Sequence, residues 1–263
     1  MNNIALIPNE NKDKNFIVTK KVTEYLHTKN IIIHDNMDNP NIDLIITLGG
    51  DGSILRIAEK AAIMGVPIIG VNLGRIGFMS EIEVDEIELL DNLFTGNYII
   101  EKRMMLDITV KRNGETTVNE RALNDAVISH GNVSRLIEII LYVNGKELNK
   151  YRADGVITAT PTGSTAYSMS AGGPIIDPLT DCFVITPICP HSIVNRPIVL
   201  SNESVISFYN KETDGVYLTV DGQKNIKLQE DDEIIIKQAD IKMKLISIKT
   251  HGFYQVLKNK MFE

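Results

Sequence analysis

A short apolar run, a glycine-rich loop and a segment of helical period follow one another in Leu44-Ile-Ile-Thr-Leu-Gly-Gly-Asp-Gly-Ser-Ile-Leu-Arg-Ile-Ala-Glu-Lys-Ala-Ala-Ile-Met64. Residues 44–48 are typical of a buried strand. Residues 53–64 place apolar side chains on one helical face, with Ser53 as a candidate N-cap and Gly65 where a helix usually ends. A strand, a loop and a helix in this order predict an α/β unit with a parallel sheet.

The rest of the first hundred residues repeats this alternation. Further buried strands are expected at residues 3–7, 31–33 and 67–71, and further helices at residues 16–28 and 85–94. We therefore predict a Rossmann-like α/β domain over residues 1–97.

The pattern changes near residue 97. Asn113-Gly114 and Asn144-Gly145 each stand between strand-like runs, and Asn-Gly is a strong hairpin signal. Strands are expected at residues 106–110, 136–143, 155–160, 205–209, 216–220, 233–237 and 241–248. These strands predict an antiparallel β-sandwich domain over residues 98–249. Residues 252–262 return to helical spacing, so we expect 250–263 to pack back on the first domain.

Charge limits the possible partners. The formal net charge is -7, which argues against nucleic-acid binding by bulk electrostatics. Most of this charge lies in residues 1–100, which carry 8 Lys and Arg against 14 Asp and Glu. An anionic ligand must therefore be met by local cations or backbone amides.

The cysteines and the apolar runs indicate a cytoplasmic protein. Cys182 and Cys189 form no disulfide framework and are expected to be reduced thiols. Residues 1–8 do not resemble a signal peptide. The longest mostly apolar stretch, 61–71, is broken by Gly65 and Pro67 and is too short for a bilayer, so no membrane partner is expected.

The loop of Gly49, Gly50, Asp51 and Gly52 is the sharpest chemical signal. Its glycines allow a tight turn, and amides at a helix N-terminus favour phosphate. An aspartate beside phosphates can orient a hydroxyl, accept its proton or help hold a metal. The alternative is a plain strand-to-helix turn with a capping aspartate. Neither the P-loop pattern nor the usual dinucleotide fingerprint occurs in the sequence.

Two further segments carry candidate site residues. Gly70-Val-Asn-Leu-Gly-Arg-Ile-Gly-Phe78 follows an expected strand, so its loop can share a pocket with the first one. Thr160-Pro-Thr-Gly-Ser-Thr-Ala-Tyr-Ser-Met-Ser-Ala-Gly-Gly-Pro174 gathers hydroxyls and glycines around Tyr167, and these groups can recognise ribose and adenine edges. The alternative for this second segment is a Ser/Thr-rich surface loop. The five histidines have no metal-binding spacing.

Taken together, these segments resemble the NAD kinase family. The matching motifs occur in the family's order: residues 49–52, 72–78, Leu123-Asn-Asp125, Asp154-Gly155, 160–174, Pro190-His191 with Asn195-Arg-Pro197, and Asp221-Gly-Gln223. The Gly-Gly-Asp-Gly loop alone is shared with lipid kinases and phosphofructokinases, whereas the segment 160–174 is specific to the family.

The resemblance implies ATP-dependent phosphorylation of the adenosine-ribose 2′-hydroxyl of NAD, giving NADP. By this resemblance Asp51 is the catalytic aspartate. The implied dinucleotide site comprises Asp51, Gly52, Arg56, Phe78, Asn124, Asp125, Arg135, Arg152, Asp154, Thr165, Ala166, Tyr167, Ser168, Met169, Ser170 and Gln223. The family also implies a divalent metal, usually Mg²⁺, carried by the nucleotide rather than by a dedicated protein cage, and a homodimer or homotetramer.

Some residues depart from the family pattern, and other functions stay open. Asp125 stands where glutamate is commoner, so its ribose contact can be longer or made through water. Polyphosphate as donor and NADH as acceptor are not decided by the sequence. A lipid kinase of the diacylglycerol or sphingosine type would share the Gly-Gly-Asp-Gly loop but would leave residues 160–174 unexplained. A non-catalytic NAD-binding sensor would not need Asp51.

Overall fold

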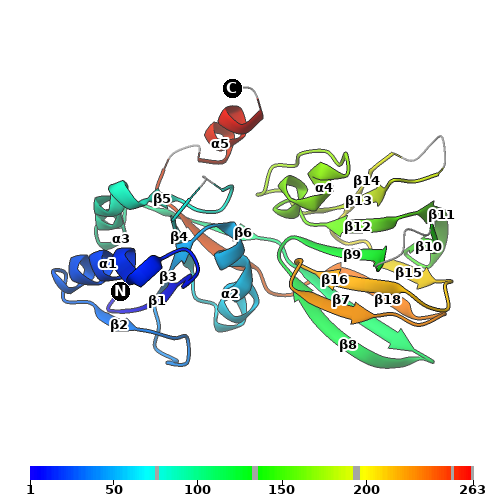
Figure 1. The fold of residues 1–263 in the computed structure, drawn as a ribbon, viewed down its shortest axis with the longest axis horizontal. Coiled ribbons are helices and arrows are strands. Elements are labelled where there is room, and N and C mark those ends of the chain that lie inside the picture. The colour runs from blue at the N-terminus through cyan, green and yellow to red at the C-terminus, as the bar shows by residue number, and fades with distance from the viewer. Residues whose placement is uncertain (75–76, 132–135, 192–195, 250–251, 262–263) are drawn as a thin grey trace. The chain divides into compact units, whose positions relative to one another are not determined.

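The computed structural model describes residues 1–263 apart from 75–76, 132–135, 192–195, 250–251 and 262–263 (Figure 1). The chain divides into two compact units. The first unit comprises Met1–Lys102 with Met243–Glu263, and the second comprises Arg103–Lys242. None of the helices within the described ranges combines the length and apolar character required to cross a membrane.

The first unit is built on a 7-stranded sheet in the order β2-β1-β3-β4-β19-β6, with β5 beside β4. Its strands are β1 (Asn3–Pro8), β2 (Ile32–His34), β3 (Leu44–Gly49), β4 (Ile68–Asn72), β5 (Ile82–Glu83), β6 (Ile99–Arg103) and β19 (Met243–Ser247). The pairs β1–β2, β1–β3, β3–β4, β4–β5 and β4–β19 are parallel. The predicted parallel α/β domain is therefore confirmed, and its loops leave the carboxyl ends of β1, β3 and β4 at one edge.

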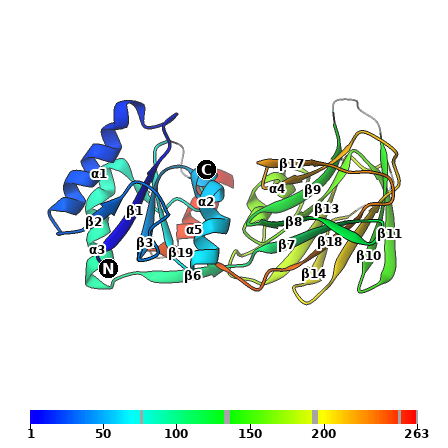
Figure 2. The ribbon, with the colours of Figure 1, turned by 90° about the horizontal axis from the view of Figure 1, so that it is seen from below.

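Helices cover both faces of this sheet. They are η1 (Lys14–Phe16), α1 (Ile17–His27), α2 (Asp51–Met64), η2 (Val84–Leu90), α3 (Asp91–Thr95) and α5 (Gly252–Met261). Figure 2 shows α1 and α3 on one face and α2 on the other. On the first face, Val22 and Leu26 of α1 share a buried core with Ile4 and Leu6 of β1. The predicted third helix, at 85–94, is mostly 3-10 helix.

The beginning of α2 corrects one prediction. The helix starts at Asp51 with Gly50 as its N-cap, so Ser53 does not cap it. The Ser53 side chain instead accepts a hydrogen bond of 3.0 Å from Asn9 Nδ2. The helix ends as predicted, because Gly65 adopts φ +68°, a left-handed conformation that glycine tolerates without strain.

The second unit is a sandwich of two antiparallel 6-stranded sheets. One sheet has the order β11-β10-β15-β18-β7-β8: β11 (Lys146–Ala153), β10 (Ile137–Val143), β15 (Ile206–Asn210), β18 (Glu233–Gln238), β7 (Leu106–Arg112) and β8 (Glu115–Ala122). The other has the order β14-β13-β12-β9-β16-β17: β14 (Ile198–Ser201), β13 (Cys182–Ile188), β12 (Gly155–Ala159), β9 (Asp125–His130), β16 (Val216–Val220) and β17 (Lys224–Lys227). Residues of both sheets, such as Phe208 and Phe183, bury a common core. The predicted sandwich is confirmed.

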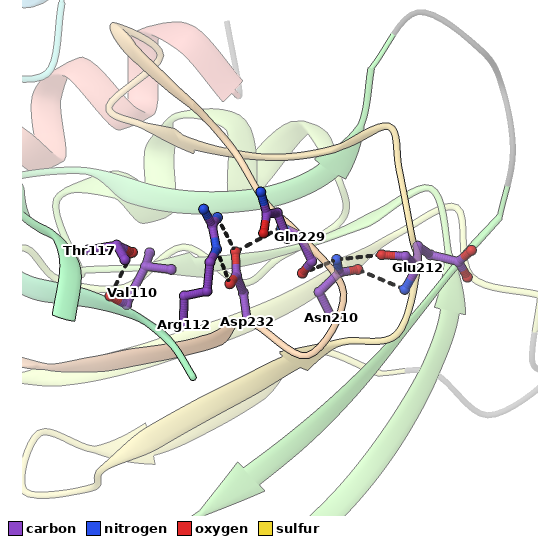
Figure 3. A network of polar contacts seen from close by, with 7 residues as sticks. All are labelled: Val110, Arg112, Thr117, Asn210, Glu212, Gln229 and Asp232. Carbon is purple, nitrogen blue, oxygen red and sulfur yellow. Dashed lines mark hydrogen bonds and ion pairs between the residues drawn. The ribbon is translucent and has the colours of Figure 1, made fainter. Parts of the chain in front are cut away.

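Local turn chemistry and an ion pair to a buried carboxylate stabilise two parts of this unit. Asn113 and Gly114 turn from β7 into β8 with φ +52° and +83°, as a type I′ hairpin turn requires. At the same end of β7, the Arg112 guanidinium binds both carboxylate oxygens of Asp232 at 2.9 and 2.8 Å. Asp232 also accepts the Gln229 backbone amide, so it links the end of one strand to the loop before another (Figure 3).

The strand predicted at 241–248 was assigned to the wrong sheet. As β19 it pairs in parallel with β4 of the first unit, through Leu245 beside Ile68. Its apolar pattern fits either sheet, and only the partner strand decides between them. The helix that follows packs on the same unit as predicted: the ring centroids of Phe253 in α5 and Phe78 are 5.8 Å apart.

Candidate functional site

The glycine loop after β3 brings backbone close to side chains. A Cβ on Gly49 would lie 2.0 Å from Ser53 Oγ, so only glycine fits there. Gly50, the N-cap of α2, contributes no side-chain cap. The helix N-terminus therefore keeps its amide groups and the positive end of its dipole toward a ligand. This arrangement suits an anion such as phosphate.

Asp51 is the first residue of α2, and its carboxylate is held by the loop before β5. Oδ2 accepts one hydrogen bond, from the Phe78 amide at 2.7 Å. Oδ1 accepts three, from the Met79 and Ser80 amides at 3.1 and 3.2 Å and from Ser80 Oγ at 3.2 Å. The side chain is thus fixed in orientation, and Oδ2 keeps acceptor capacity for one more donor.

The loop amides can reach the Asp51 carboxylate because Gly77 has no side chain. A Cβ at Gly77 would lie 1.9 Å from Asp51 Oδ1 and 2.3 Å from its Cγ. The next residue, Phe78, is braced from the other side by Phe253 and by the Lys260 ammonium, which lies 5.2 Å from the Phe78 ring centroid. The loop that orients Asp51 therefore rests on the C-terminal helix of the same unit.

The second predicted cluster lies in the sandwich, where residues 160–176 pack on β12 and on the turn before β9. Thr160 donates its hydroxyl to the Leu123 carbonyl at 2.6 Å and its amide to the Asn124 carbonyl at 2.8 Å. A Cβ on Gly163 would lie 2.1 Å from the same Asn124 oxygen. The segment contains η3 (Gly163–Thr165) and α4 (Tyr167–Ser170), and Ile176 packs on the face of the sheet. It is a packed structure, not a Ser/Thr-rich surface loop.

Asp221 organises the turn that carries Asn124 and Asp125. Its carboxylate accepts the Leu123, Asn124 and Asp125 amides at 2.8, 2.7 and 3.1 Å. Asp125 is only 4% exposed. Burial, assisted by the negative charge of Asp221, raises the pKa of Asp125 to about 7. Asn124 Oδ1 is buried and has no hydrogen-bond partner within the described residues, so it is available to a ligand.

A cavity of about 350 Å³ lies beside this turn. It is lined by Asn124, Asp125, Val127, Ser129, Ala166, Tyr167, Thr219, Asp221 and Gly222. Four predicted site residues thus meet there: Asn124, Asp125, Ala166 and Tyr167. Tyr167 is 47% exposed, so much of its side chain is open to a ligand.

The other predicted residues lie outside this cavity. Ser168 is fully buried, and its hydroxyl hydrogen-bonds that of Thr186 at 2.9 Å. Thr165 is half-buried, Ser170 and Gln223 are exposed, and Arg152 is exposed on β11. Asp154 lies 3.7 Å from His130 Nε2. In the first unit, Gly52 and Arg56 are exposed on α2. Arg135 lies outside the described residues, as do Arg75, Ile76 and Asn195 of the matching motifs.

Sequence reasoning missed the two residues that organise the loops from within. Asp221 was quoted only as part of a motif, and its contacts reach 96 to 98 residues back along the chain. Asn72 was quoted likewise. Its Nδ2 donates to the Gly74 carbonyl at 2.7 Å, whereas its Oδ1 is buried without a hydrogen-bond partner within the described residues. Across those residues, no group of three or more His, Cys, Asp and Glu is placed to hold a metal ion.

A glycine loop and an oriented carboxylate at a helix N-terminus are the arrangement expected of a phosphotransferase. Two family models match the chain. The model of the ATP-NAD kinase N-terminal domain matches residues 33–98, and that of the C-terminal domain matches residues 123–248. The chain belongs to the ATP-NAD kinase family. It is accordingly an enzyme, a phosphotransferase with an alcohol acceptor, and its function is NAD kinase activity.

Individual relatives agree with this assignment. The chain is 43% identical over 282 residues to an NAD kinase of Thermoanaerobacter sp. (strain X514), with 100% of both chains covered. It is similar in structure to yeast NADH kinase complexed with NADH, with TM-score 0.85, 25% identity and coverage of 99% of this chain and 87% of the other. It is also similar to an NAD kinase from Archaeoglobus fulgidus in complex with ATP, with TM-score 0.78, 27% identity and 98% of both chains covered.

Proposed function

We propose that the chain transfers the terminal phosphoryl group of ATP to the 2′-hydroxyl of the adenosine ribose of NAD, with Asp51 as the catalytic residue. The observation that supports this role is the geometry of the Asp51 carboxylate. Oδ1 is engaged by three donors and Oδ2 by one. One oxygen therefore remains able to accept the hydrogen bond of a substrate hydroxyl.

Asp51 acts mainly by positioning. A carboxylate is too weak a base to remove a ribose proton before the phosphorus is attacked, so it orients the hydroxyl and takes the proton late. Phosphoryl transfer depends on alignment and charge stabilisation more than on covalent help from the protein. The carboxylate held by the loop amides supplies the alignment, and the amides at the N-terminus of α2 favour the phosphate charge.

We propose that the cavity beside the Asp221 turn binds the dinucleotide. Asn124 offers an unpaired amide oxygen, and Asp125 offers a buried carboxyl group. The amide oxygen can accept a hydrogen bond from a ribose hydroxyl, and the carboxyl group can accept one or, when protonated, donate one. The open ring of Tyr167 can pack on a base. Ser168 supports this segment from within through Thr186. The remaining family positions in this proposal are Gly52, Arg56, Phe78, Arg135, Arg152, Asp154, Thr165, Ala166, Ser170 and Gln223.

A divalent metal fits the residues beside the glycine loop. Asn72 Oδ1 is a buried oxygen without a hydrogen-bond partner among the described residues, and it lies 3.8 Å from where a Cβ on Gly50 would be. An amide oxygen is one of the ligands that Mg²⁺ accepts. When bound with ATP, Mg²⁺ would neutralise charge on the transferred phosphoryl group. We propose that the nucleotide carries the metal and that Asn72 Oδ1 contacts it there.

We further propose a homodimer or homotetramer that works in the cytoplasm, with no nucleic-acid or membrane partner. The net charge of -7 supports the lack of a nucleic-acid partner. Cys182 and Cys189 are both free thiols, as a reducing compartment would keep them.

The test is a coupled assay with NAD, ATP and Mg²⁺, in which an NADP-specific dehydrogenase detects the product. Asp51→Asn is expected to lower turnover far more than NAD affinity. Asp240→Asn, a loss of the same charge at an exposed position, is the matched control and should change neither. Equal losses of turnover and affinity in Asp51→Asn would contradict its catalytic role. NADP formed with polyphosphate but not with ATP would change the donor, and no NADP with either donor would overturn the proposed reaction.

A further inference from the structure

We propose that Lys12 binds the phosphate chain of the donor against the glycine loop. This inference rests on the proposed function, because it assigns the cation that meets the donor of that reaction. Lys12 lies outside every motif that matches the family. Its position in the structure, not its surroundings in the sequence, indicates the role.

Backbone hydrogen bonds place Lys12 over the loop. The Asn9 amide donates to the Leu48 carbonyl at 2.8 Å, which holds the segment after β1 against the end of β3. The Lys12 amide then donates to the Asn9 carbonyl at 2.9 Å and turns the chain back. As a result, Lys12 Nζ lies 3.1 Å from where a Cβ on Gly50 would be. The ammonium group therefore lies next to Gly50, the N-cap of α2.

The space beside this ammonium is a cavity of about 450 Å³. Its lining is Lys12, Val18, Lys21, Asn72, Leu73, Gly74, Glu83, Val84 and Asp85. Lys21 already donates to the Val84 carbonyl at 3.1 Å. Lys12 Nζ makes no ion pair or side-chain hydrogen bond with the described residues, so its charge is available to a ligand.

The charge of the surrounding residues favours a cation at this position. Residues 1–100 carry a formal net charge of -6, and Glu83 and Asp85 line the same cavity. A polyphosphate chain entering there is repelled unless cations lie close to it. Lysine serves as a point charge for phosphate, and this ammonium lies beside Gly50, the N-cap of the 14-residue helix α2.

A buried group points independently to a ligand in this space. Asn72 is 5% exposed and lines the cavity, and its Oδ1 has no hydrogen-bond partner within the described residues. Burying an amide oxygen without a partner is costly. A ligand that brings a proton donor or a cation with its phosphates would satisfy this oxygen while Lys12 binds the phosphates themselves.

The experiment compares Lys12→Gln with Lys14→Gln, which removes the same charge from an exposed residue of the same segment that does not line the cavity. We expect Lys12→Gln to raise KM for ATP about tenfold, equivalent to about 1.4 kcal/mol, while KM for NAD and the melting temperature stay unchanged. Lys12→Arg should recover most of the loss. Inorganic tripolyphosphate, measured by calorimetry in the absence of NAD, should lose affinity by a similar factor in Lys12→Gln only.

The outcomes separate this inference from the proposed function. Wild-type protein that forms no NADP overturns the proposed reaction, while the tripolyphosphate titration still tests Lys12. Active wild-type protein with unchanged KM for ATP in Lys12→Gln overturns the role of Lys12 alone. Equal rises of KM for ATP and NAD, or equal effects in Lys14→Gln, would also contradict it, since they indicate a general electrostatic or structural change.

Discussion

Asp125 offers a prediction whose size follows from the structure. It begins β9 and is 4% exposed. Burial and then the charge of Asp221 raise its pKa to about 7. In the unfolded chain an aspartate titrates near 3.9. Between these two values the folded protein keeps a proton that the unfolded chain releases, so a rise in pH favours unfolding.

The size of the effect follows from linkage. Each pH unit between the two pKa values costs about 1.4 kcal/mol of folding stability. From pH 5 to pH 8 the wild type should therefore lose about 3 kcal/mol through Asp125, almost all of it below pH 7. Asp125→Asn places a neutral side chain of nearly the same shape in the same turn. It removes this dependence, so the variant should gain on the wild type as pH rises.

The assay is urea unfolding of wild type, Asp125→Asn and the control Asp240→Asn at pH 5, 6, 7 and 8. The free energy of unfolding of Asp125→Asn minus that of wild type should grow by about 3 kcal/mol across the series, while the difference for Asp240→Asn stays flat. A difference that changes by less than about 0.5 kcal/mol, the usual scatter of surface substitutions, would show that Asp125 is ionised in the fold and would refute the reasoning.

Two more substitutions test the contacts that position the site. Gly77→Ala should lower turnover at least about tenfold, because its Cβ would displace the Asp51 carboxylate from the loop amides. Gly252→Ala, whose Cβ would meet only Glu81 Oε2 at 3.6 Å, is the control, and equal kinetics of the two variants would contradict the argument. Asp232→Ala should lower the melting temperature by several degrees, because it removes a fully buried carboxylate that holds Arg112 and the Gln229 amide. Asp240→Ala, at an exposed position, should change it little, and a comparable loss in both would argue against the role of the Asp232 contacts.

The sequence predicted those features of the fold that local chemistry determines. The Asn113-Gly114 turn and the end of α2 at Gly65 are correct because each depends on a positive φ that these residues tolerate. Ser53 is not the N-cap because the helix already begins at Asp51, and its hydroxyl pairs instead with Asn9, 44 residues away. The strand at 241–248 was placed in the wrong sheet for a similar reason: its partner, β4, is distant in sequence. Contacts of this kind leave no periodic signal.

In the candidate site, too, the sequence identified some residues and missed others, because the site depends on carboxylates that bind backbone amides. Asp51 and Asp221 each bind three amides of a loop far along the chain, yet the sequence singled out Asp51 for its place in a glycine loop and passed over Asp221. The two aspartates differ in which group the loop around each of them offers to a ligand. The loop around Asp51 presents the carboxylate itself. The turn around Asp221 presents its neighbours Asn124 and Asp125, and the charge of Asp221 helps to keep Asp125 protonated. Residue type and spacing can identify the first kind of residue, whereas the second is recognisable only once the turn is folded.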